Sequence, residues 1–286
     1  MKEGIYLKKF LIFLFFIVGL FLLILTNTSW LSFAGNNDEI SVTDDISKIK
    51  IDVSSVGTII IPEKRDTVAF DYKGKGKVKL KQNGNTIKVE LQSRNWINFF
   101  SFNNKKLTIY LPEQFDKELN IKSRSGNVQF SGKSKMELDK LAIEIGSGNI
   151  EVQDISANTF KSEGSSGNLE IHSLTANSGT VKMKSGNIEI KDYIGELSSS
   201  ITSGRLDLHL AELSNNLSVK VNSGNATVDI PDSADFLLKG EIGSGDISTN
   251  YALSEINEEK HSIEGKSGTG KHDIILDVNS GRIELE

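Results

Sequence analysis

Short segments in which apolar and polar residues alternate recur through most of the chain, and the clearest of them share one pattern. Residues 149–152, 168–171, 187–190 and 205–208 each place an acidic residue between two apolar ones, directly after a turn signal. In an extended strand, neighbouring side chains point to opposite faces, so each apolar pair faces a core and each acid faces solvent. The pattern therefore predicts a series of half-buried β-strands.

The turn before each of these strands carries Ser-Gly-Asn or a close variant, and it recurs about every 20 residues. A second alternating segment precedes several turns, for example at 141–145 and 181–184, and a third apolar position recurs at Ile155, Leu174 and Ile194. One such unit cannot bury its apolar face alone, so we expect stacked units. The sequence predicts an all-β fold, a parallel β-solenoid of triangular cross-section, with regular repeats over about 119–286. Its turn glycines are Gly126, Gly148, Gly167, Gly186, Gly204, Gly224, Gly245 and Gly281.

The chemistry of this turn fits a corner between two sides of a coil. Glycine adopts positive φ without strain, as a tight bend requires. The Asn that follows it can hydrogen-bond its stacked copies through the side-chain amide. We interpret the corners as structural turns with a polar ladder. The alternative is a row of Ser and Asn side chains that grips a glycan.

Two parts of the chain depart from the period. Residues 48–112 are rich in alternating segments but irregular, so they are expected to form either the first rungs or a cap. Residues 251–271 interrupt the repeats, and a surface excursion with a short helix is expected there. The alternative is a catalytic site built on Glu255, Glu258, Glu259 and His261.

The amino-terminal region is apolar and uncharged over 10–25, and no charge follows until Asp38. Because a bilayer core about 30 Å thick needs roughly 20 helical residues, 10–30 is predicted to be a single transmembrane anchor. Lysines precede it and acids follow it, so 1–9 is expected in the cytoplasm and the body outside the cell membrane. Residues 31–47 are then a tether and 48–286 the repeat domain. A cleaved signal peptide is the alternative.

Composition narrows the classes of function. The net charge of −5 argues against nucleic acid as a partner, and the lack of cysteine excludes a disulfide framework and a thiolate metal site. The four histidines form no His-Glu-x-x-His pattern, and no Gly-x-Ser-x-Gly turn occurs. We therefore expect a protein without enzymatic activity and without a cofactor.

The strand pattern also stacks carboxylates. Glu151, Glu170, Glu189 and Asp207 take equivalent positions, with Glu284 further along. Like charges at strand spacing repel, so lysines ahead of the turns are expected to offset them, namely Lys122, Lys182 and Lys220. A calcium stripe is the alternative, but the Gly-Gly-x-Gly-x-Asp motif is absent, and no metal site is predicted.

Two segments are candidates for contact with a cell-envelope partner. The first is the aromatic run with Trp96, Phe99, Phe100 and Phe102, which would stack on sugars or enter a headgroup layer if exposed, or otherwise cap the open end of the coil. The second is a row of alternating lysines that would meet anionic wall polymer or lipid, or protect an edge strand from pairing. These are Lys73, Lys75 and Lys77, continued by Lys79 and Lys81.

The Ser-Gly-Asn/Asp repeats, together with the closing residues 265–274 and 279–285, resemble a bacterial β-strand-repeat family labelled "putative adhesin", a domain of unknown function. With its amino-terminal anchor the chain is similar to LiaG-type envelope-stress proteins. The resemblance implies a non-enzymatic, extracytoplasmic solenoid that binds or scaffolds a cell-wall polymer or an envelope protein, within an envelope-stress response. Alternatives are a glycan-degrading β-helix enzyme and a module for adhesion or self-association through the ends of the coil.

Overall fold

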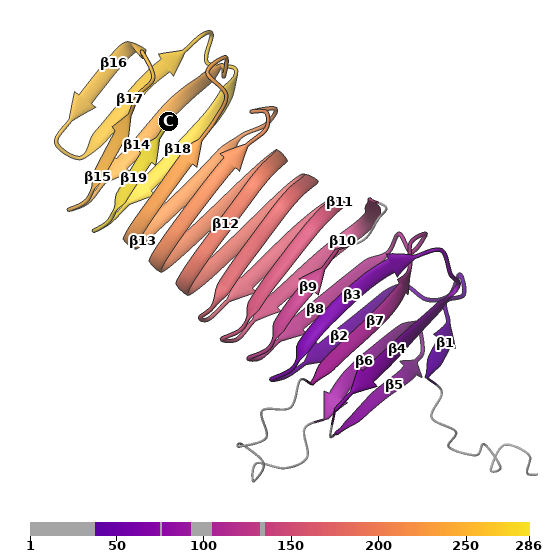
Figure 1. Cartoon of the computed structure of the whole chain (residues 1–286). Helices are drawn as coiled ribbons and strands as arrows, with labels where there is room; N and C mark the ends of the chain where they lie inside the picture. Colours follow the sequence, from indigo (N-terminus) through magenta and orange to yellow (C-terminus); the bar gives the residue numbers. More distant parts are fainter. Residues whose placement is uncertain (1–37, 75, 93–104, 132–134) are drawn as a thin grey trace, which may run out of the picture. The chain divides into compact units, whose positions relative to one another are not determined.

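The computed structural model describes residues 38–74, 76–92, 105–131 and 135–286, which belong to one compact unit, Asp38–Glu286. Within these residues the chain forms nineteen β-strands and no helix (Figure 1). Accordingly, no described helix is long and apolar enough to cross a membrane. The predicted anchor, 10–30, lies outside the described residues, so it stays a prediction.

The strands vary in length because some of them run around the corners without a break. In chain order they are β1 (Glu39–Ser41), β2 (Lys48–Val53), β3 (Gly57–Glu63), β4 (Thr67–Lys73), β5 (Lys77–Asn83), β6 (Thr86–Gln92), β7 (Lys106–Pro112), β8 (Glu118–Ser123), β9 (Asn127–Phe130), β10 (Met136–Ile145), β11 (Asn149–Gly164), β12 (Asn168–Leu210), β13 (Leu217–Asp229), β14 (Phe236–Ile242), β15 (Asp246–Thr249), β16 (Ser254–Glu259), β17 (Ser262–Ser267), β18 (His272–Val278) and β19 (Arg282–Leu285).

In the middle of the unit the chain coils, and each turn of the coil pairs in parallel with the next. β10 pairs with β11 in the register Met136↔Ile155, and β11 pairs with β12 in the register Asn149↔Asn168. Both registers pair a residue with the equivalent residue one sequence repeat later. The all-β repeat architecture is therefore confirmed, and these parallel pairings agree with the coil that the period predicts.

Strands that precede a Ser-Gly-Asn corner make up the first side of the stack, and strands that follow it make up the second side. Along the first side, β8, β10, β11, β12 and β13 follow one another in chain order. At both ends that order breaks. β2 lies between β6 and β8, and β18 lies between β13 and β14. The second side repeats this arrangement, with β3 between β7 and β9, and β19 between β13 and β15.

Antiparallel strands cover the two ends of the stack. At the amino end β5 pairs with β6, β4 pairs with β7, and β1 pairs with β4. At the carboxyl end β17 pairs with β14 and β16 pairs with β17. The irregular part, 48–112, thus holds both rungs and capping strands. The short helix expected within 251–271 was wrong, because that segment contains two strands. The expected tether also contains structure, since β1 and the buried Ile46 fall inside 31–47.

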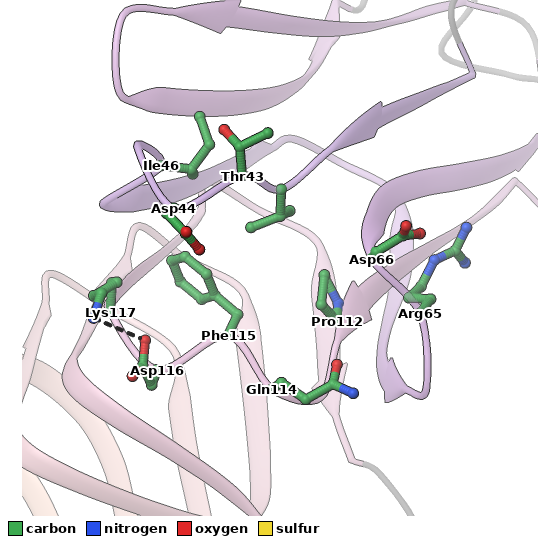
Figure 2. Close-up of a pocket in the computed structure, with 11 residues that line it drawn as sticks. Thr43, Asp44, Ile46, Arg65, Asp66, Pro112, Gln114, Phe115, Asp116 and Lys117 are labelled. Atoms are coloured by element: carbon green, nitrogen blue, oxygen red, sulfur yellow. Dashed lines mark ion pairs between the residues drawn. The ribbon is translucent and has the colours of Figure 1, made fainter.

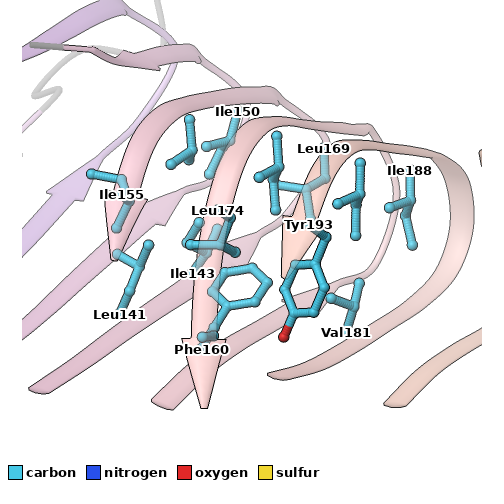
Figure 3. Close-up of a cluster of buried hydrophobic side chains, with 14 of the residues drawn as sticks. Leu141, Ile143, Ile150, Ile155, Phe160, Leu169, Leu174, Val181, Ile188 and Tyr193 are labelled. Carbon is cyan, nitrogen blue, oxygen red and sulfur yellow. The ribbon is translucent and has the colours of Figure 1, made fainter. Parts of the chain in front are cut away.

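The core is a continuous column of apolar side chains inside the coil (Figure 3). Ile155 and Leu174 are buried as the pattern predicts, but at the next rung Tyr193 is fully buried and Ile194 is only half-buried. Tyr193 lies beside Phe160 and donates a hydrogen bond from its hydroxyl to the carbonyl oxygen of Glu196 at 2.7 Å. Burial raises the pKa of this hydroxyl, so it stays protonated. The spacing of 19 residues between Ile155 and Leu174 leads to Tyr193, and the prediction missed by one residue because it took the more apolar neighbour Ile194.

Candidate functional site

The Ser-Gly-Asn corners bring the backbones of neighbouring rungs very close together. A Cβ built on Gly167 would lie 2.1 Å from the carbonyl oxygen of Gly148, and one on Gly224 would lie 2.3 Å from that of Gly204. Among the eight turn glycines only three adopt positive φ, namely Gly167, Gly186 and Gly204. Positive φ therefore does not explain all eight. The common reason is the contact with the adjacent backbone, which leaves no room for a side chain.

The Asn residues beside these glycines form the predicted hydrogen-bonded ladder on an exposed face. The amide of Asn149 donates to Asn127 at 3.1 Å, that of Asn168 donates to Asn149 at 2.8 Å, and that of Asn187 donates to Asn168 at 3.0 Å. The ladder is confirmed as a structural feature. Because its inner amides already bond to each other, part of their capacity to bind a glycan is used.

A second corner follows three successive segments of the second side, 149–152, 168–171 and 187–190, and its chemistry was not predicted from the sequence. Asp154, Ser173 and Asp192 adopt left-handed backbone conformations, with φ of 56°, 57° and 55°. They are spaced 19 residues apart, so the period was the signal that would have found them. Short polar side chains such as Asp tolerate this conformation better than most residues do.

The stacked carboxylates lie on the second side, next to the Asn ladder. Glu151 is in register with Glu170, whereas Thr227 separates Asp207 from Glu284. Cationic side chains offset the charge within single strands: Arg205 contacts Asp207 at 2.9 Å, and Lys191 pairs with Glu189. The ring of His172 lies within hydrogen-bonding distance of Glu170, at 2.8 Å.

The lysines expected to offset these carboxylates pair elsewhere. Lys122 contacts Glu144 and Lys220 contacts Asp277, and both pairs lie on the first side. That part of the prediction was wrong, because the segments before and after a corner belong to different sides of the coil. No group of acids and histidines able to hold a metal ion occurs among the described residues.

The lysine row falls on the amino end of the stack. Lys73 is the exposed last residue of β4, Lys77 is the exposed first residue of β5, and Lys75 lies outside the described residues. Lys79 and Lys81 are in register with Glu90 and Lys88 of β6, so they share the outer face of β5 with Lys77. The aromatic run with Trp96, Phe99, Phe100 and Phe102 also lies outside the described residues. Its role as a contact surface stays a prediction.

A hollow of about 470 Å³ opens at the same end, where three connections meet (Figure 2). Its walls come from residues 42–46 before β2, 65–66 after β3, and 112–117 before β8. Asp44, Asp66 and Asp116 give it a slight excess of negative charge over Arg65 and Lys117. Asp116 and Lys117 pair with each other at 3.1 Å.

Arg65 is the most constrained charge in this hollow. Its guanidinium donates to Glu63 at 2.8 Å and to the Thr67 hydroxyl at 2.9 and 3.2 Å, and it lies 5.4 Å from the ring centre of Tyr110. These contacts hold the β3–β4 turn against the second side. The side chain is therefore a structural anchor, and the hollow contains no nucleophile paired with a base.

The glycine-rich closing segment forms a clamp at the carboxyl end. One carboxylate oxygen of Asp235 accepts hydrogen bonds from the backbone N–H groups of Thr269, Gly270 and Lys271 at 2.7–2.9 Å, and the other accepts from the Thr269 hydroxyl. Such converging N–H groups form an anion-binding nest, and here the anion belongs to the chain itself. These hydrogen bonds lower the pKa of the Asp235 carboxyl, and the bond from the backbone N–H of Lys271 has the largest effect.

Comparison with solved structures supports the fold. A "putative adhesin" from Parabacteroides distasonis ATCC 8503 shares 17% identity at a TM-score of 0.56, over 87% of this chain and 95% of that chain. A second "putative adhesin", from Parabacteroides merdae ATCC 43184, shares 14% identity at a TM-score of 0.52, over 87% of this chain and 94% of that chain. No curated protein matches the chain.

These features define the chain as a stacked β-repeat domain. The family model described as Toastrack DUF4097 matches residues 46–286, and the chain belongs to this family. The resemblance to an adhesin-like β-repeat family of unknown function is thereby confirmed. The similarity to LiaG-type proteins is not shown and stays a prediction.

Proposed function

We propose that this chain is a non-enzymatic, membrane-anchored module that displays its β-repeat domain outside the cell and binds or scaffolds a cell-envelope partner in an envelope-stress response. The observation that carries the proposal is the form of the repeat surface. The ladder from Asn127 to Asn187 presents the same polar group on four successive rungs. A surface of this kind suits an extended partner better than a small substrate.

The names of the structural neighbours, adhesins rather than enzymes, support the non-enzymatic part of the proposal. The acids around 251–271 support it as well. Glu255, Glu258 and Glu259 lie on β16, where every residue is exposed, and Glu255 pairs with Lys266 at 2.6 Å. A glycan-degrading site needs two acids facing each other across a substrate.

The lysine row is the surface through which we expect the domain to bind a partner electrostatically. Cationic side chains at an exposed edge attract anionic polymers and lipid headgroups, and salt screens that attraction. The test is co-sedimentation of residues 38–286 with peptidoglycan, with teichoic polymer and with anionic liposomes, across a salt series. We expect binding that is lost at high salt and in the variant K73E/K75E/K77E.

The matched control reverses two exposed lysines in the middle of the stack, K182E/K184E, and is expected to keep binding. Equal loss of binding in both variants would show that the net charge of the domain, and not the position of the lysines, determines binding. If the wild-type domain sediments with none of the three materials, the polymer and lipid partners are excluded and a protein partner becomes the expectation.

The anchor is tested separately on the full chain. We expect it in the membrane fraction, with the repeat domain cleaved by protease added outside the cell. Removal of residues 10–30 is expected to abolish membrane association. A mature protein that begins after residue 34 would instead show a cleaved signal peptide.

A further inference from the structure

The first side of the stack ends in two strands of opposite charge. β5, at the amino end, carries Lys77, Lys79 and Lys81, and β16, at the carboxyl end, carries three glutamates, Glu255, Glu258 and Glu259 (Figure 1). Among the described residues β5 pairs only with β6, and β16 pairs only with β17. Each strand thus has an outer edge whose backbone N–H and C=O groups are a template for pairing with another strand, and the edge of β16 is interrupted by a bulge between Ser254 and Asn257.

The directions of the two strands fit each other. β5 is antiparallel to β6, which is parallel to the rungs of the first side. β17 is antiparallel to β14 and β16 is antiparallel to β17, so β16 again runs in the direction of the rungs. A second copy displaced along the stack therefore brings its β5 alongside β16 in antiparallel orientation. The strands have matching lengths of seven and six residues.

The outward faces of the two strands also match. On β5 the lysines face outward, while Val78 and Leu80 face the core side. On β16 Glu259 faces outward, opposite Ser262, and Glu258 faces the core side, opposite Ile263. The register of β16 shifts between Ser254 and Asn257, where Glu255 has a φ of 51° and the side chain of Ile256 is 57% exposed. In the antiparallel pair Glu259 meets the outward lysines, whereas Glu258 lies on the face of Val78 and Leu80.

The second side leaves room for this contact. At the carboxyl end the first side extends beyond the last rung by β17 and β16, whereas the second side stops at β15. At the amino end the second side extends further, because β1 pairs with β4 beyond the level of β5. The two ends are therefore stepped in opposite senses, and β1 lies next to β5 at the amino-end step.

We propose that β16 of one copy pairs with β5 of the next, so that copies of this chain join head to tail into a filament. Two β5 edges repel each other, as do two β16 edges, so only the mixed pair forms. The contact joins two different surfaces and does not close on itself, which makes the assembly open-ended. Both the filament and an envelope ligand use the lysine row, but only the filament also needs β16, so changes on β16 distinguish the two.

The test is sedimentation velocity on residues 38–286 without envelope material. This part suits the test because it is one compact unit, Asp38–Glu286. At low ionic strength we expect the sedimentation coefficient to rise with concentration. In about 1 M salt, where the screening length is about 3 Å, we expect the monomer value. A domain that stays monomeric at every concentration in low salt overturns the proposal.

Charge reversal identifies the surfaces. K79E/K81E alone and E258K/E259K alone are each expected to be monomeric, because each variant carries two edges of the same sign. An equimolar mixture of the two is expected to associate again, which a misfolded variant does not do. The control K182E/K184E is expected to assemble like the wild type. Association that survives either edge reversal, or a mixture that remains monomeric, sinks the proposal.

Discussion

The hydroxyl of Tyr193 occupies the space in which the side chain of Gly179 would begin: a Cβ on Gly179 would lie 2.3 Å from that oxygen. Gly179 has no positive φ, so its backbone conformation accepts alanine, and the Tyr193 hydroxyl is the closest obstacle, ahead of Leu197 Cδ1 at 3.0 Å and the Glu196 carbonyl oxygen at 3.2 Å. We expect Gly179→Ala to lower the free energy of unfolding by roughly 1–3 kcal/mol through overpacking. Denaturant unfolding of residues 38–286 measures it.

The pair can be separated by a double-mutant cycle. Tyr193→Phe removes both the hydroxyl and its hydrogen bond to Glu196, at a cost of about 1 kcal/mol. Because Phe also removes the obstacle, Gly179→Ala is expected to cost less in the Phe background, with a coupling of at least about 0.5 kcal/mol. Additive costs would show that the hydroxyl is not what excludes a side chain at Gly179.

A corner glycine without positive φ tests the cause of the glycine repeat. In Gly224→Ala the new Cβ would lie 2.3 Å from the carbonyl oxygen of Gly204, and backbone cannot move aside as a side chain can. We expect a loss of about 3 kcal/mol in the free energy of unfolding. Gly57→Ala is the control, since its Cβ would lie 3.8 Å from the nearest atom and is expected to be neutral or slightly stabilising. Equal effects at both positions would contradict the close-approach explanation.

The Asn ladder makes a positional prediction. Asn168 both donates and accepts a ladder hydrogen bond, whereas Asn127 only accepts one. We expect Asn168→Ala to cost roughly 1–2 kcal/mol and Asn127→Ala about half of that, measured by chemical denaturation. If the two costs are equal or negligible, the amides bond to water as well as to each other, and the ladder is free to bind a ligand.

The Asp235 clamp predicts a pH dependence. Its hydrogen bonds lower the pKa of this carboxyl from an ordinary value of 3.8, so the charged form stabilises the folded state above that pH. The contribution is lost as the pH falls through the lower, folded-state pKa. Asp235→Asn should therefore have a lower denaturation midpoint than the wild type at neutral pH, and the gap should narrow below about pH 4.

Asp232 provides the matched comparison for the clamp, because it is an exposed acid three residues earlier in the same connection. Asp232→Asn is expected to follow the wild-type midpoint across the whole pH range. An Asp235→Asn gap that stays constant down to pH 2 would show that geometry rather than charge holds the closing segment.

The sequence was most informative where a residue contacts the equivalent residue of the next repeat. The strand that starts at Asn149 and the one that starts at Asn168 carry the same pattern, so their pairing could be inferred directly. The Asn ladder could be inferred for the same reason, because each residue of a repeat lies beside the equivalent residue of the next repeat. What failed within the repeats was the choice of Ile194 as a core residue: the 19-residue spacing from Ile155 to Leu174 leads to Tyr193, but Tyr is less apolar than its neighbour Ile194.

The ends of the stack were not predictable in the same way. β5 pairs with β6, and β16 pairs with β17, in local antiparallel contacts. The spacing of the sequence repeats therefore carries no information about these pairings. The interruption at 251–271 was visible, but alternation over six residues does not distinguish a strand from an irregular excursion. The candidate contacts were only partly located: Lys77 reaches an edge strand as the protective interpretation expects, while the aromatic run lies outside the described residues.

The position of β18 and β19 between β13 and β14–β15 also sets the order in which the domain can be completed. A chain that emerges from its amino end has already made β14 and β15 before their neighbours exist. Until residues 272–285 arrive, these strands have no parallel partner, and such sequence-distant pairings form slowly and expose strand edges to aggregation. Synthesis therefore has to reach residues 272–285 before the strands of the carboxyl end can complete their parallel pairing.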